Sequence, residues 1–216
     1  YWKLFFNINY YLENRPENPL IITFGGAFSN HISTVSAIGN LAEIKTLGII
    51  RGEELEKKWT HNPTLVFAKK NGMNLKFVTR EEYRHKDKLT EFLQQEFPQA
   101  LIIPEGGTNK NAVHGVKMML NNDTKDFDYL CTAVGTGGTL AGISEFCEEN
   151  QKVIGFKVVD DSSLESKISE LTTKQNFYLT DAAYGGYGKI NDENVRFING
   201  FKMKFDIPLE PVYTGK

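Results

Sequence analysis

The sequence has little net charge, few cysteines and no long apolar run, and each scarcity excludes a class of protein. Its 216 residues include 25 basic and 27 acidic side chains, giving a formal net charge of -2. The chain therefore lacks the excess of positive charge that would indicate binding to nucleic acid or to an anionic membrane surface. No apolar run approaches the roughly 18 residues that span a bilayer. We therefore expect neither nucleic acid nor a membrane as a partner.

The cysteines are too few and too far apart for a zinc site. Only Cys131 and Cys147 are present, without CxxC spacing and without a histidine at ligand spacing. We expect no metal. Cytosolic proteins rarely keep a disulfide. Two reduced thiols in a cytoplasmic protein are therefore the interpretation we favour over a disulfide.

What is present is the composition of a folded globular protein. Apolar residues make up 40% and charged residues 24% of the chain, which is close to the average for soluble domains. The sequence begins at Tyr1 within the pattern YWKLFFNINYYLEN and ends at PVYTGK. Because both ends lie within structure-forming patterns, we expect a chain that is truncated at both ends.

Short apolar runs alternate with helical patterns along most of the chain. The runs PLIITF, KTLGII, LKFVT and ALIIP predict strands before residue 104, and DYLCTAV, KVIGFKVV and NFYLT predict strands after it. The run DYLCTAV, at 128–134, is expected to be buried on both faces. Such alternation indicates parallel sheets covered by helices. We predict two α/β domains, a smaller one at 1–104 and part of a larger one at 105–216.

The stretch AVGTGGTLAG, at 133–142, is the strongest local signal. It follows an apolar strand and opens a helix. Glycines there let a ligand approach the backbone, and the free amides of a helix start attract anions. No Gly-Lys-Ser/Thr follows, and the spacing is not that of a dinucleotide fingerprint. A phosphate site is therefore favoured over a turn without a ligand.

Two further stretches are weaker when each is taken alone. FGGAFSNH also joins a strand to a helix, and its amides at Ser29, Asn30 and His31 suit a smaller anion such as a carboxylate. Serine and asparagine are, however, the commonest helix caps. The loop YGGYG and the segment EPVYTGK offer tyrosines for stacking on a ring or for proton transfer. Loop tyrosines beside glycine are more often packing residues.

Together these stretches are specific. TFGGAFSNHI, GIIRGEE, NPTL, IPEGGTN, AVGTGGTLAG, GGYG and PVYTGK, in this order, resemble the pyridoxal-phosphate-dependent family of D-cysteine desulfhydrase and 1-aminocyclopropane-1-carboxylate deaminase. The resemblance covers essentially the whole chain. It implies the tryptophan-synthase-β-like fold (fold type II), pyridoxal 5'-phosphate (PLP) bound in a cleft between two domains, an amino-acid substrate and a homodimer.

The resemblance also implies roles for individual residues. Asn30 resembles the residue that hydrogen-bonds the oxygen on the cofactor ring. Ser29 and His31, with the helix amides, resemble the pocket for the substrate carboxylate, and Ser29 resembles a residue that moves a proton. The expected cradle for the cofactor phosphate consists of Gly135, Thr136, Gly137, Gly138 and Thr139.

The two tyrosine stretches acquire catalytic roles from the same resemblance. Tyr213 resembles the aromatic residue at the face of the cofactor, and Tyr187 resembles its partner near the substrate. Tyr213 is therefore expected both to contact the cofactor and to take part in catalysis.

The start of the chain departs from the family pattern. The family's Schiff-base lysine lies in a Gly-Asn-Lys motif, and YWKLFF matches the sequence after it, so that Lys3 aligns three places downstream. We expect that lysine to lie immediately before Tyr1, outside this chain. Lys3 would take the role of the Schiff-base lysine only if the register of this match were shifted. The fragment by itself is therefore expected to be inactive.

Thr214 is the second departure. Deaminases of this family have a glutamate there, which holds the pyridine nitrogen of the cofactor protonated. A neutral hydroxyl makes a weaker electron sink, which suffices for β-elimination. We therefore predict that the full-length enzyme converts D-cysteine to pyruvate, ammonia and hydrogen sulfide. The alternatives are a 1-aminocyclopropane-1-carboxylate deaminase and, from another class, a non-catalytic binder of a phosphorylated metabolite.

Overall fold

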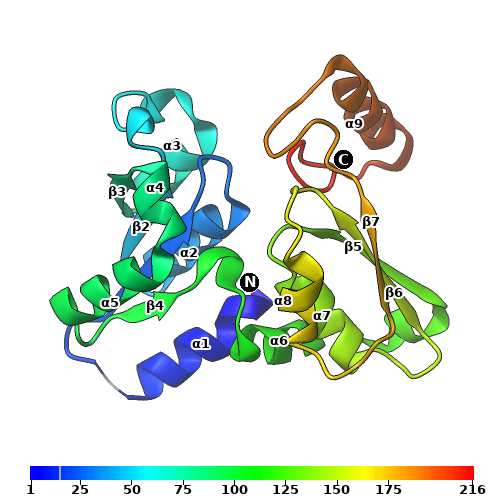
Figure 1. The fold of residues 1–216 in the computed structure, drawn as a ribbon, viewed down its shortest axis with the longest axis horizontal. Helices are drawn as coiled ribbons and strands as arrows, with labels where there is room; N and C mark the ends of the chain where they lie inside the picture. The colour runs from blue at the N-terminus through cyan, green and yellow to red at the C-terminus, as the bar shows by residue number, and fades with distance from the viewer. Residues whose placement is uncertain (15) are drawn as a thin grey trace. The chain divides into compact units, whose positions relative to one another are not determined.

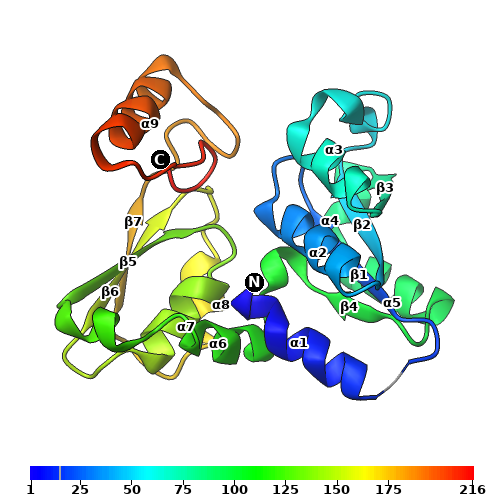
Figure 2. The ribbon, with the colours of Figure 1, turned by 180° about the vertical axis from the view of Figure 1, so that it is seen from behind.

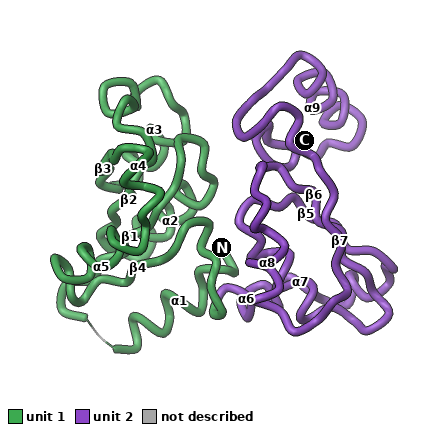
Figure 3. Tube along the Cα trace, viewed as in Figure 1, with its two compact units in different colours: residues 1–111 green, residues 112–216 purple. Residues whose placement is uncertain are grey.

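Two compact units make up the computed structural model, which describes residues 1–14 and 16–216 (Figures 1 and 3). Unit 1 is Tyr1–Asn111 and unit 2 is Ala112–Lys216. The sequence-based boundary lies at residue 104. The segment after it belongs to unit 1, because Lys3 Nζ donates to the carbonyl of Gly106 and the Asn7 side chain hydrogen-bonds Asn109.

Unit 1 contains a parallel four-stranded sheet in the order β3-β2-β1-β4. Its strands match the runs predicted from the sequence and are β1 (Leu20–Gly25), β2 (Lys45–Arg51), β3 (Asn74–Val78) and β4 (Leu101–Ile103). Its helices are α1 (Trp2–Glu13), α2 (Asn30–Leu41), α3 (Pro63–Lys70), α4 (Arg80–Arg84) and α5 (Lys86–Glu96). Short 3₁₀ turns are η1 (Glu53–Leu55), η2 (Trp59–His61) and η3 (Glu105–Gly107).

Both faces of the unit 1 sheet are buried. Neighbouring residues in one strand point to opposite faces, so Ile21 packs with α1, α2 and α3 while Ile22 packs with α4 and α5. Ile49 and Ile50 of β2 divide in the same way, and all four isoleucines have no exposed surface. This double cover explains why these strands read as continuous apolar runs.

The sequence NPTLVFAKKNG predicts a helix that Asn62 caps, Pro63 begins and Gly72 ends, and α3 confirms these signals. The Asn62 side chain accepts a hydrogen bond from the Leu65 amide, Pro63 is the first helical residue, and Gly72 has a φ of +81° just beyond the end. These are the usual start and stop signals of a helix. The sequence also predicts an apolar face of α2 that ends at Leu41, but Leu41 is 84% exposed.

Unit 2 contains a parallel three-stranded sheet in the order β5-β6-β7. Its strands are β5 (Tyr129–Val134), β6 (Lys152–Lys157) and β7 (Phe177–Asp181). Its helices are α6 (Lys110–Lys117), which begins at the end of unit 1, α7 (Gly138–Phe146), α8 (Leu164–Ser169) and α9 (Asp192–Phe205), and the 3₁₀ turn is η4 (Asn122–Asp126). The sequence NAVHGVKMMLNN predicts a helix over 111–122, and α6 is shorter than this because it ends at Lys117.

The prediction that β5 is buried on both faces is wrong. Its burial alternates, and Tyr129 is 57% exposed while Val134 is 2% exposed. In the region described, α7 and α8 lie on one side of the β5–β7 sheet and no helix lies on the other (Figures 1 and 2). The outer side contains Tyr129, Cys131, Ile154, Phe156 and Tyr178, in register across the strands.

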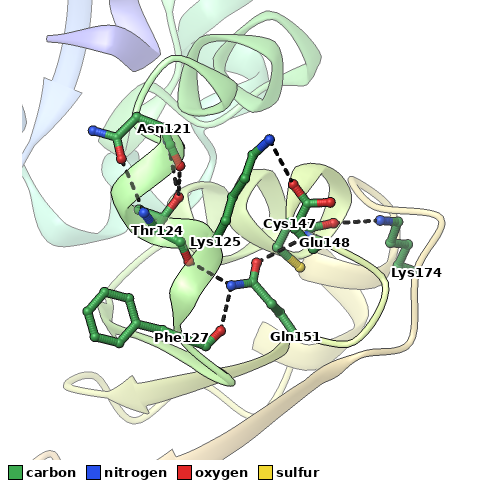
Figure 4. Close-up of polar contacts among 8 residues, drawn as sticks. All are labelled: Asn121, Thr124, Lys125, Phe127, Cys147, Glu148, Gln151 and Lys174. Atoms are coloured by element: carbon green, nitrogen blue, oxygen red, sulfur yellow. Dashed lines mark hydrogen bonds and ion pairs between the residues drawn. The ribbon is translucent and has the colours of Figure 1, made fainter.

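Buried hydrogen bonds hold the connection into β6 (Figure 4). The Gln151 side chain, 2% exposed as a residue, donates to the carbonyls of Thr124 and Phe127 and accepts from the Glu148 amide. One side chain thus satisfies three backbone groups that strand pairing does not reach. No helix formed by residues 1–14 or 16–216 is both long and apolar enough to cross a membrane.

Candidate functional site

The glycine turn after β5 leads into α7 without a side-chain cap. Gly137 is the N-cap residue, with a φ of +85°, and it has no side chain to accept a hydrogen bond from the helix amides. Within the described chain, the amides of Gly138, Thr139 and Leu140 donate to no backbone carbonyl. Unpaired amides at a helix start carry partial positive charge. The turn can therefore accept an anion with several oxygens.

Close packing explains why glycine is needed at two positions of this turn. A Cβ on Gly137 would lie 2.5 Å from Cγ1 of Ile168, and the positive φ disfavours other residues there. A Cβ on Gly135 would lie 3.1 Å from Cε1 of Tyr213. The ring of Tyr213 therefore lies against the turn predicted to bind phosphate.

The structure also brings Tyr213 and Tyr187 together. Their ring centroids are 6.1 Å apart and their planes are inclined by 69°, an edge-to-face arrangement. The Thr214 hydroxyl lies beside them in sequence but is exposed, accepts from the Glu210 amide at 2.9 Å and donates to the Glu210 carbonyl at 3.4 Å. For Thr214 to contact a ligand, its hydroxyl would have to share or leave these bonds.

The start of α2 differs from that of α7 in having a side-chain cap. Ser29 is 7% exposed, and its hydroxyl accepts from the Ile32 amide at 3.3 Å. The Ser29 amide donates to Gly26, while the amides of Asn30 and His31 have no acceptor among the residues described. The Asn30 residue is exposed. Two free amides and an exposed amide side chain suit a small anion such as a carboxylate.

The His31 ring is turned away from this role. Its Nε2 lies 2.6 Å from the hydroxyl of Thr23, which in turn donates to the carbonyl of Ile103. Burial, and then the nearby Lys3 ammonium, lower the pKa of His31 to about 3. The ring is therefore neutral near pH 7, so His31 offers an anion its backbone amide rather than a charged ring.

Lys3 lies near His31 and is a further candidate for a functional residue. In the sequence, only its alignment with the family motif pointed to it. Its Nζ donates to the carbonyl of Gly106 at 2.5 Å and lies 3.4 Å from the Thr108 hydroxyl. Among the described residues no carboxylate pairs with it. Burial lowers the pKa of Lys3 to about 8. Thr23, the partner of His31, could have been noticed in the sequence, because it is a polar residue inside an apolar strand.

The predicted site residues thus form two groups. Ser29, Asn30 and His31 gather at the start of α2 in unit 1. The Gly135–Thr139 turn, Tyr187 and Tyr213 gather in unit 2. Sequence reasoning gave no role to Glu210 or Lys216, although both lie in the stretch EPVYTGK. The part of the chain that is described holds no cluster of three potential metal ligands.

Comparisons with curated proteins find relatives that cover most of this chain. No protein-family model matches it. It is 27% identical over 221 residues to a candidate 1-aminocyclopropane-1-carboxylate deaminase of Pyrococcus horikoshii, covering 91% of this chain and 66% of that protein. It is 27% identical over 227 residues to the bifunctional D-cysteine desulfhydrase/1-aminocyclopropane-1-carboxylate deaminase of Arabidopsis thaliana, covering 91% and 56%. The chain spans less than two thirds of the length of these two relatives.

Comparisons with solved structures find the same fold. A crystal structure of a homologue of 1-aminocyclopropane-1-carboxylate deaminase matches 99% of this chain and 70% of its own, with a TM-score of 0.82 and 24% identity. A hydrogen sulfide-producing enzyme of Fusobacterium nucleatum matches 99% and 74%, with a TM-score of 0.67 and 14% identity. These comparisons confirm the predicted resemblance and the fold of fold type II PLP-dependent enzymes.

Proposed function

We propose that this chain, a homologue of 1-aminocyclopropane-1-carboxylate deaminase and D-cysteine desulfhydrase, is part of a PLP-dependent enzyme that eliminates sulfide from a small amino acid. The observation that carries the proposal is the uncapped start of α7. Three free amides meet there at a turn whose glycines leave no room for a side chain, with the Tyr213 ring packed against it. This arrangement suits the phosphate and the adjoining ring of one cofactor.

The residues present fit PLP. The Gly135–Thr139 turn would hold the phosphate, because the amides of Gly138 and Thr139 donate to no described backbone group and Gly137 gives the helix no side-chain cap. Asn30 would donate to the oxygen on the ring, and Tyr213 would lie at the face of the ring. When bound, PLP supplies an electron sink that weakens the bonds to the α-carbon of an amino acid.

The start of α2 would bind and orient the substrate. The free amides of Asn30 and His31 suit its carboxylate, and the neutral His31 ring keeps its bond to Thr23. Binding at two fixed amides would hold the α-carbon in one orientation. The Ser29 hydroxyl and the Tyr187 phenol are the groups that would move protons, Ser29 while it caps Ile32.

We propose D-cysteine as the substrate, converted with one water to pyruvate, ammonia and hydrogen sulfide. At the position where the resemblance places an acid in the deaminases, this chain has Thr214, a neutral side chain already bonded to the Glu210 backbone. Without a carboxylate there, the pyridine nitrogen of the cofactor gains no negative counter-charge. This supports elimination of a good leaving group over opening of a cyclopropane ring.

Cofactor binding tests the phosphate cradle on the chain itself. Titration with PLP and with pyridoxal, which lacks the phosphate, compares the two affinities. We expect PLP to bind at least about tenfold more tightly, a difference of about 1.4 kcal/mol. Thr139→Val should reduce that ratio, and Thr180→Val on the outer face of β7 is the matched control. Equal affinities for both compounds contradict the cradle.

Sulfide release tests the reaction. The complete protein that carries this chain is assayed with PLP and either D-cysteine or L-cysteine. Sulfide from the D-isomer alone supports the proposal. Ammonia from 1-aminocyclopropane-1-carboxylate without sulfide from D-cysteine favours the deaminase. Binding of PLP without either reaction favours a non-catalytic binder of a phosphorylated metabolite. Sedimentation of the same protein tests the homodimer that the resemblance implies.

A further inference from the structure

The segment Glu210–Lys216 is held by its two charged ends, which do not pair with each other. The Glu210 carboxylate accepts three amides of its own segment, from Val212 at 2.8 Å, Tyr213 at 2.6 Å and Thr214 at 2.9 Å. These bonds curl the chain around one carboxylate. They fix the backbone on both sides of the Tyr213 side chain.

Lys216 binds a different part of the chain, and it donates to carbonyls where Glu210 accepts from amides. Its Nζ donates to the carbonyls of Ala183 at 2.7 Å, Gly186 at 2.9 Å and Lys189 at 2.9 Å. An ammonium group has three protons, so all of them are used on one loop. Burial lowers the pKa of Lys216 below its usual value.

The loop that Lys216 binds has a conformation that needs support. Tyr184, Gly185, Gly186 and Gly188 all have positive φ, from 43° to 115°. For the non-glycine Tyr184 this backbone conformation costs free energy, and glycines lose much entropy on ordering. Tyr187 lies within this run, between the carbonyls of Gly186 and Lys189. Three charge-assisted hydrogen bonds offset the cost of ordering the loop.

The segment is in turn anchored to the body of unit 2. The Gly215 carbonyl accepts from the Asn194 side chain of α9 at 3.4 Å, and a Cβ on Gly215 would lie 2.6 Å from Cδ1 of Ile198. The segment thus joins α9 on one side to the 183–189 loop on the other. The edge-to-face pair of Tyr213 and Tyr187 lies across this junction.

We propose that Lys216 is a positioning residue that sets the Tyr187 phenol relative to Tyr213 and the glycine turn. Its importance for catalysis rests on the function proposed above, whereas the positioning itself does not. Without the ammonium, three carbonyls lose their donor and the loop is released. The amides of Val212, Tyr213 and Thr214 keep their bonds to Glu210, so the effect falls mainly on Tyr187.

Fluorine NMR tests this on the chain alone, with no cofactor or substrate. The nine tyrosines are replaced by 3-fluorotyrosine, and the signals of the pair are assigned with Tyr187→Phe and Tyr213→Phe. We expect Lys216→Met to move and broaden the Tyr187 signal, and to move the Tyr213 signal less. Lys216→Arg, which keeps a cation with several donors, should restore part of the shift. Lys202→Met, an exposed residue of α9, should move neither signal.

Unchanged signals for both tyrosines in a folded Lys216→Met variant would overturn the proposal. If that variant does not fold, Lys216→Gln replaces it. The same two signals are then expected to move, but by less. Unchanged signals in Lys216→Gln would likewise overturn the proposal. In the complete enzyme, kcat is expected to fall about tenfold in Lys216→Met with KM little changed. A shifted Tyr187 signal without any detectable activity in the unsubstituted enzyme would retain the positioning and count against the proposed function alone.

Discussion

The two units use the same elements but cover their sheets differently. In unit 1, helices bury both faces of the sheet, and strand residues that point in opposite directions are equally buried, as Ile49 and Ile50 show. In unit 2, the helices described bury one face, and Tyr178 of β7 is 56% exposed while its neighbour Leu179 packs into the core. The parallel order of the strands is the same in both. An apolar run in a parallel strand therefore does not by itself show that both faces are covered.

The helices of the two candidate sites, α2 and α7, also start differently. The Ser29 hydroxyl satisfies one amide of α2 and leaves two, whereas Gly137 satisfies none of the first amides of α7. A side-chain cap competes with a ligand for the same donors. The capped start thus suits a carboxylate with two oxygens, and the uncapped start suits a phosphate with more.

Gly137→Ala is expected to have the largest effect and to be confined to unit 2. Its new Cβ would meet Ile168 at 2.5 Å on a backbone with φ of +85°. Strain and overpacking together should cost about 3 kcal/mol or more. Both tryptophans, Trp2 and Trp59, lie in unit 1. Urea unfolding should therefore shift when followed by circular dichroism and not when followed by tryptophan fluorescence.

Gly72→Ala in unit 1 is the matched control for that substitution. Gly72 has a similar φ of +81°, but nothing lies within 4 Å of a Cβ placed there. Only backbone strain of about 1 kcal/mol is expected, and here the fluorescence transition should move. A common shift of both signals in Gly137→Ala would show that the units unfold together.

Acid is expected to weaken unit 1 through His31. Its pKa is about 3 in the folded chain, against an ordinary value of 6.5. The unfolded chain then binds more protons between these values, so the free energy of unfolding falls as the pH drops from 6.5 towards 3. One proton limits the slope to about 1.4 kcal/mol per pH unit. His31→Gln should flatten this slope, measured by tryptophan fluorescence in urea at several pH values.

Lys3 should act at the other end of the pH range. Its pKa is about 8 in the folded chain against 10.5 ordinarily. The unfolded chain again binds more protons, so the free energy of unfolding should rise as the pH increases from 8 towards 10.5. Lys3→Met removes this rise while His31→Gln keeps it. A Lys3→Met variant with the same slope as the unsubstituted chain would contradict a desolvated ammonium.

Particular residues show how much of this was predictable from the sequence. The strands, the cap at Asn62 and the glycine turn at Gly137 follow from short-range patterns. The role of Lys216 does not, because Lys216 binds carbonyls about 30 residues away and no local spacing signals that contact. The turn of the His31 ring towards Thr23 likewise depends on how α2 packs on β1. The contact of Tyr213 with Gly135 also depends on tertiary packing, so the sequence alone does not predict it.

The smallest effect is expected on the outer face of the unit 2 sheet. Phe156 is 39% and Tyr178 is 56% exposed, so Phe156→Thr and Tyr178→Thr should each change the free energy of unfolding by about 0.5 kcal/mol or less. Threonine retains a good strand propensity. Together the two changes should also lower the binding of the dye ANS, which reports exposed apolar surface.

Ile49→Thr, on the covered sheet of unit 1, is the contrasting variant and should cost several kcal/mol. A loss of similar size in Phe156→Thr would mean that this face is covered in solution, and the contrast between the two sheets would then disappear.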